Sequence, residues 1–129
     1  MPGAISDFLE NKLVDHTLRN VVYNPPASVW MALYTANPTD ADVGVEVAGG
    51  NYARRQVTFG APANGVTTNS AEIRFPTAAA GWGHITHFGI RDAAAGGNLL
   101  YHGELAAHVD INIGDIFVVP VGQLSVTMA

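Results

Sequence analysis

The chain has 129 residues, the length of one domain, and 48% of them are hydrophobic while only 13% are charged. Intrinsic disorder requires the opposite composition, so the chain is expected to fold. The net charge of −5, with Lys12 as the single lysine and no run of basic residues, argues against nucleic-acid binding, and cysteine is absent, which excludes disulfides and thiolate metal sites. Neither a membrane span nor a secretory signal is expected, because no apolar stretch is long enough and the N-terminus lacks a basic segment.

One helix is predicted at the N-terminus, over about residues 6–20. Ser6 can cap it by accepting a hydrogen bond from an unpaired amide of the first turn. Apolar residues then recur at helical spacing, beginning with Leu9 and Leu13. We interpret residues 1–24 as an N-terminal helix and linker. The apolar stripe must be buried on the chain's own strands or on a partner, so Leu9 and Leu13 are candidate interface residues.

From residue 25 onward the hydrophobic period changes from helical to two. Seven or eight short strands follow at roughly ten-residue spacing, the pattern of an all-β sandwich or barrel. The expected strands are 29–34, 52–59, 71–75, 84–91, 99–105, 108–113, 116–121 and 124–128. Asn64-Gly65 predicts a tight hairpin turn, and the acidic, Gly-rich stretch 41–51 an exposed loop. The predicted fold is therefore mainly β, a single antiparallel β-sandwich or barrel over 25–129 with one N-terminal α-helix.

Four histidines lie close enough in the sequence to suggest a metal site. His84 and His87 are three residues apart on a predicted strand, so regular alternation places them on opposite faces. A site would need His87 and His102 from paired strands, with Glu104 beside His102. No local ligand pair or cysteine reinforces it, so we expect no metal and no cofactor. His87 and His102 are instead candidates for cross-strand hydrogen bonds or a subunit contact.

Calcium-binding and catalytic sites are also without a clear pattern in the sequence. Asp40, Asp42 and Glu46 share one loop but lack the spacing of a calcium-binding loop, so they are expected to be solvated. No serine lies in a Gly-x-Ser-x-Gly turn, and no phosphate-binding loop is present in the sequence. Strands could bring two carboxylates together as a glycosidase requires, but nothing indicates it. We therefore predict no catalytic residues.

One aromatic residue and two charged residues lie at unusual positions that indicate contacts, either within the chain or with a partner. Trp82 lies between two glycines, where it either closes the end of its own barrel or anchors a partner. Arg54 and Arg55 place one arginine on each face of their strand. One of them should be exposed, and the other must pair with an acid or reach across an interface. Trp82, Arg54 and Arg55 complete the candidate interface residues.

Four blocks of the sequence resemble a family of small virion structural proteins of tailed bacteriophages, described as hypothetical or "tail fiber-like" proteins. The resemblance covers nearly the whole chain in the same order, in residues 10–16, 29–40, 49–59 and 87–92. It implies a component of a phage particle and supplies no catalytic residues.

We therefore expect a virion structural protein, made in the cytoplasm of the host bacterium, that is not an enzyme. The first hypothesis is a capsid decoration or cement protein, a homo-oligomer that binds the major capsid protein. The alternative is a tail fibre or appendage protein that contacts tail proteins or the host surface. An unrecognised enzyme such as a glycan hydrolase is the third possibility.

Overall fold

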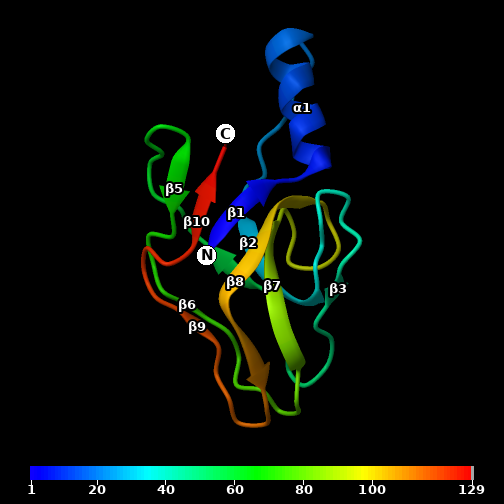
Figure 1. Cartoon of the computed structure of the whole chain (residues 1–129). Helices are drawn as coiled ribbons and strands as arrows, with labels where there is room; N and C mark the ends of the chain where they lie inside the picture. Colours follow the sequence, from blue (N-terminus) through cyan, green and yellow to red (C-terminus); the bar gives the residue numbers. More distant parts are fainter. Residues whose placement is uncertain (129) are drawn as a thin grey trace.

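The structure, a computed structural model, describes residues 1–128, so only the last residue of the predicted β-region lies outside it. An eight-stranded sheet has the order β3-β2-β7-β8-β1-β10-β5, with β4 also paired to β2, and β6 and β9 form a second, two-stranded sheet (Figure 1). The strands are β1 (Pro2–Ile5), β2 (Val29–Ala36), β3 (Val45–Glu46), β4 (Arg55–Val57), β5 (Val66–Thr68), β6 (Ile73–Arg74), β7 (Gly83–Arg91), β8 (Leu99–Ile111), β9 (Val118–Val119) and β10 (Ser125–Thr127).

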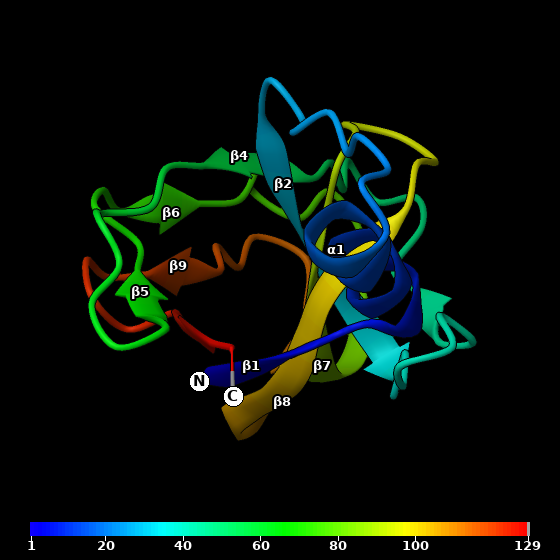
Figure 2. The same cartoon turned by 90° about the horizontal axis from the view of Figure 1, so that it is seen from above.

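One buried apolar cluster joins the two sheets. Met31 and Leu33 of β2 and Ile85 of β7 share it with Ile73 of β6 and Val119 of β9. Each of these side chains is at most 3% exposed, and burying one of this size contributes roughly 1.5–3 kcal/mol. Seen from above, the strands of both sheets lie around a common centre (Figure 2). The core therefore holds the long strands β2, β7 and β8 in fixed positions, and these strands carry most of the site described below.

The predicted mainly β fold with one N-terminal helix is confirmed, but the sheet is mixed rather than antiparallel. β1 pairs with β10 in parallel, with Pro2 opposite Ser125, and with β8 in antiparallel, with Ala4 opposite His102. Of the two predicted architectures, the closed barrel is not formed, because the end strands β3 and β5 of the described sheet do not pair with each other. Nothing local predicts β1, since Pro and Gly disfavour strands and its pairing partners lie about 100 residues away.

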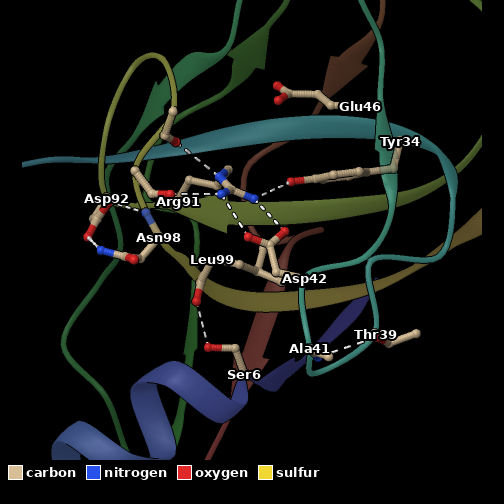
Figure 3. Close-up of polar contacts among 12 residues, drawn as sticks. Ser6, Tyr34, Thr39, Ala41, Asp42, Glu46, Arg91, Asp92, Asn98 and Leu99 are labelled. Carbon is tan, nitrogen blue, oxygen red and sulfur yellow. Dashed lines mark hydrogen bonds and ion pairs between the residues drawn. The ribbon is translucent and has the colours of Figure 1, made fainter.

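The helix α1 (Asp7–Leu18) begins where the sequence predicts it. Ser6 Oγ accepts a hydrogen bond from the Leu9 N–H at 3.2 Å and donates one to the Leu99 carbonyl at 2.6 Å, so the cap also ties α1 to β8 (Figure 3). The helix ends two residues before its predicted limit, since Asn20 adopts a left-handed conformation with φ of +57°. Beyond its first turn, α1 stands clear of the strands (Figure 1).

Two further sequence predictions have clear outcomes. Asn64 and Gly65 have φ of +53° and +76°, and Ala63 and Val66 exchange two 3.0 Å hydrogen bonds around them, so the tight hairpin turn is confirmed. The two strands predicted over 99–113 are instead one strand, β8. Its irregular pairing with β7 interrupts the alternation on which the prediction of two strands was based.

Candidate functional surface

A buried arginine ties the loop after β2 to the loop after β7. Arg91, 8% exposed, donates to both carboxylate oxygens of Asp42, at 2.8 and 2.9 Å, and to the Tyr34 hydroxyl at 3.0 Å (Figure 3). It also donates to the carbonyls of Gly96 and Gly97. Burial opposes the charge on Arg91, but its interactions with Asp42 and Tyr34 outweigh this effect and raise its pKa. Sequence reasoning missed this residue, whose only signal is a charge at the end of a buried strand.

Of the alternatives predicted for Arg54 and Arg55, which lie just before and at the start of β4, the structure shows one exposed arginine and one paired with an acid. Arg54 is 9% exposed and binds both carboxylate oxygens of Glu46, at 2.7 and 2.8 Å, while Arg55 is exposed. Tyr52 also donates to Glu46, at 2.7 Å. Burial alone would raise the pKa of Glu46, but the hydrogen bonds from Arg54 and Tyr52 hold it below its usual value. Burial and its bond to Glu46 in turn raise the pKa of Tyr52.

The three loop acids do not gather around one point. Asp42 binds Arg91, Glu46 binds Arg54, and Asp40 lies 2.6 Å from His102 Nε2. The expectation that all three are simply solvated is wrong for Asp42 and Glu46, because each compensates a largely buried guanidinium. These pairs hold the acidic loop against the sheet.

A shallow cavity of about 480 Å³ lies over β1 and the middle of β8. His87, His102 and Glu104 line it together with Asn37. Since β7 and β8 are paired, His87 lies opposite Glu104 in the ladder, and His102 lies opposite Gly89. Partial burial lowers the pKa of His87, and the nearby histidines add to this effect while Glu104 opposes it. The cavity presents imidazole, carboxylate and amide groups, which suit polar contacts.

Trp82 lies in the core rather than on the surface. It is 5% exposed, its ring meets Tyr52 edge-on with centroids 5.3 Å apart, and its Nε1 donates to the Gly50 carbonyl at 2.8 Å. Of the two interpretations of this residue, closure of the chain's own core agrees with the structure.

Several apolar side chains on α1 and just after it are exposed within residues 1–128. Leu9 is buried and Leu13 is half-buried. The next apolar residues are exposed: Val14 (52%), Leu18 (79%), Val21 (45%) and Val22 (75%). The first turn of α1 is thus anchored while its second half projects. Within residues 1–128, no helix has both the length and the hydrophobicity that a membrane crossing requires.

The candidate interface residues therefore divide into two groups. Leu9, Arg54 and Trp82 are buried within this chain and have contacts there. The others reach the surface in whole or in part: Leu13, Arg55, His87 and His102. Their contact with another molecule stays a prediction.

A comparison with protein families identifies what kind of protein carries this surface. Residues 4–127 match the family described as "Podophage GP4 fiber I protein gp80". The chain belongs to this family. It is accordingly a structural protein associated with the virion of a tailed phage, as the resemblance of the sequence implied. A search of curated proteins gives no match.

Proposed function

We propose that this protein is a subunit of a fibre or appendage on the phage particle, where it acts through binding and not through catalysis. The observation that carries the proposal is the family match over 4–127, since the family is described as a fibre protein. It supports the fibre alternative better than the capsid-decoration hypothesis. The polar cavity around His87 and His102 offers a surface for host contact, and the projecting helix offers one for assembly.

The projecting half of α1 supports assembly with a second copy of the chain. Val14 and Leu18 of the helix, and Val21 and Val22 just after it, are exposed apolar side chains that a partner would remove from water. A two-fold symmetric contact would bury these side chains of both copies at once.

This assembly is tested by measuring the molar mass of the purified protein with light scattering over a range of concentrations. Wild type should form a dimer or a higher oligomer, and Leu18→Glu with Val22→Glu should shift it to monomer. Asn11→Glu is the matched control, because Asn11 is exposed on the same helix but is not apolar. A wild type that stays monomeric at all concentrations would contradict helix-mediated assembly.

The place on the particle is tested by copy number. Quantitative mass spectrometry of purified virions should find this protein in far fewer copies than the major capsid protein. Copy numbers close to those of the capsid protein would instead support the decoration hypothesis. Binding of the soluble protein to host cells, compared with a His87→Ala, His102→Ala variant, would test whether the cavity takes part in host contact.

A further inference from the structure

An irregularity in the β7–β8 pairing brings three histidines together on the outer face of the sheet. Ile85 is opposite Val109 and His87 is opposite Glu104, so the single residue Thr86 faces four residues of β8. Because four residues face one, this bulge breaks the regular alternation of side chains between the two faces in both strands. Consequently, the sequence-based argument that His84 and His87 lie on opposite faces is wrong.

His108, within this bulge, lies near both of the other imidazoles. Its ring centroid is 5.5 Å from that of His84 and 6.4 Å from that of His87. Two imidazoles that share one tetrahedral zinc ion, with Zn–N bonds of about 2.0–2.1 Å, have centroids roughly 5–6 Å apart. The rings of His84 and His108 thus already have the separation of a metal-bound pair, and His87 is close to it.

Each of the three rings has one nitrogen held by a neighbouring oxygen. His84 Nδ1 lies 2.7 Å from Asp110, and His108 Nε2 lies 3.0 Å from Glu104. His87 Nδ1 lies 2.7 Å from the Thr86 hydroxyl. Metal-binding histidines are commonly oriented in this way, because a carboxylate that accepts from one ring nitrogen leaves the other as a basic ligand.

The opposite nitrogens of these rings are the ligands available to an ion. His84 Nε2, His87 Nε2 and His108 Nδ1 have no hydrogen-bond partner within residues 1–128. The three ligand atoms do not yet lie within 4.8 Å of one another, as those of the exposed acids Asp7, Glu10 and Asp40 do. Binding an ion therefore requires the side chains of His84 and His108, which are both exposed, to turn toward His87.

We propose that His84, His87 and His108 form a binding site for a divalent transition-metal ion, with Zn²⁺ as the best match. Imidazole ligands favour zinc, copper and nickel over calcium and magnesium. Three protein nitrogens leave the fourth tetrahedral position to water. Asp110 and Glu104 supply negative charge next to the ion and orient His84 and His108. The proposal concerns this face of the sheet alone and does not depend on where the protein sits on the virion.

The test is calorimetric titration of the EDTA-treated, dialysed full chain with ZnCl₂ at pH 7.5. Wild type should bind one zinc ion per chain, and His108→Gln should abolish binding. Asp110→Asn should weaken it about tenfold, because it removes the group that orients His84. His16→Gln should leave binding unchanged, because His16 is exposed on the helix α1 and is not part of the β7–β8 face.

Circular dichroism of each variant confirms that loss of binding is not loss of fold, which is expected because His84 and His108 are exposed. Failure of the wild type to bind zinc would overturn the proposal. So would binding that persists in a folded His108→Gln variant, or that is lost equally in His16→Gln.

Discussion

Neutralising Asp42 tests whether the arginine network under the acidic loop stabilises the fold. Asp42→Asn suits the position, since Asp42 has φ of +59° and Asn tolerates this conformation. The change removes one acceptor and the negative charge opposite Arg91. Net contributions of hydrogen bonds to charged groups are about 1.5–3 kcal/mol. The Asp42 side chain is 37% exposed and Arg91 keeps Tyr34 as a partner, so we expect about 1.5 kcal/mol, the lower end of that range.

Urea unfolding followed by tryptophan fluorescence measures this loss. Glu72→Gln is the matched control, because the Glu72–Arg74 pair is 3.3 Å apart with side chains 50% and 59% exposed, and exposed pairs of this kind contribute about 0–1 kcal/mol. In an Arg91→Met background, Asp42→Asn should cost almost nothing. The reasoning would be refuted by a loss no larger than that of Glu72→Gln, or by the same loss in the Arg91→Met background.

Three other perturbations have expected outcomes in the same assay. Trp82→Ala should lower the free energy of unfolding by about 3–5 kcal/mol, the usual cost of truncating a buried tryptophan; a change below 1 kcal/mol would show that the ring is not part of the core. Gly103→Ala should destabilise strongly because its Cβ would collide with the Pro2 carbonyl. Gly60→Ala should be close to neutral, because its Cβ would meet only the Thr68 carbonyl, at an ordinary contact distance of 3.9 Å. The lowered pKa of Glu46 means that the unfolded chain binds more protons in acid, so stability should fall as the pH drops below the usual glutamate value of 4.5. Glu46→Gln should flatten this decline, and an unchanged pH profile would count against the effect.

Local signals predicted the parts of the fold that depend on neighbouring residues. Ser6 can be recognised as a helix cap because its partner, the Leu9 N–H, is three residues away. The Asn64-Gly65 turn is predictable for the same reason, since both residues must adopt positive φ in a two-residue hairpin. The pattern around Arg54 indicated correctly that one arginine of the pair would be exposed and the other would need an acid or an interface, although it did not indicate which residue would be which.

Features that depend on distant pairing could not be predicted. β1 is a strand because β8 and β10 hold it, not because Pro2 and Gly3 favour one. The bulge that gathers His84 and His87 arises from four residues of β8 facing Thr86, and strand alternation in a single sequence contains no sign of it. Similarly, the Arg91–Asp42 pair joins residues 49 positions apart.

The position of the protein on intact particles tests the central proposal most directly. Gold-labelled antibody against the soluble chain, imaged by electron microscopy on purified virions, would locate it. A fibre or appendage subunit should be labelled at the tail or at a projecting fibre, with the shell unlabelled. Uniform labelling of the capsid surface would contradict the proposal and support the decoration hypothesis.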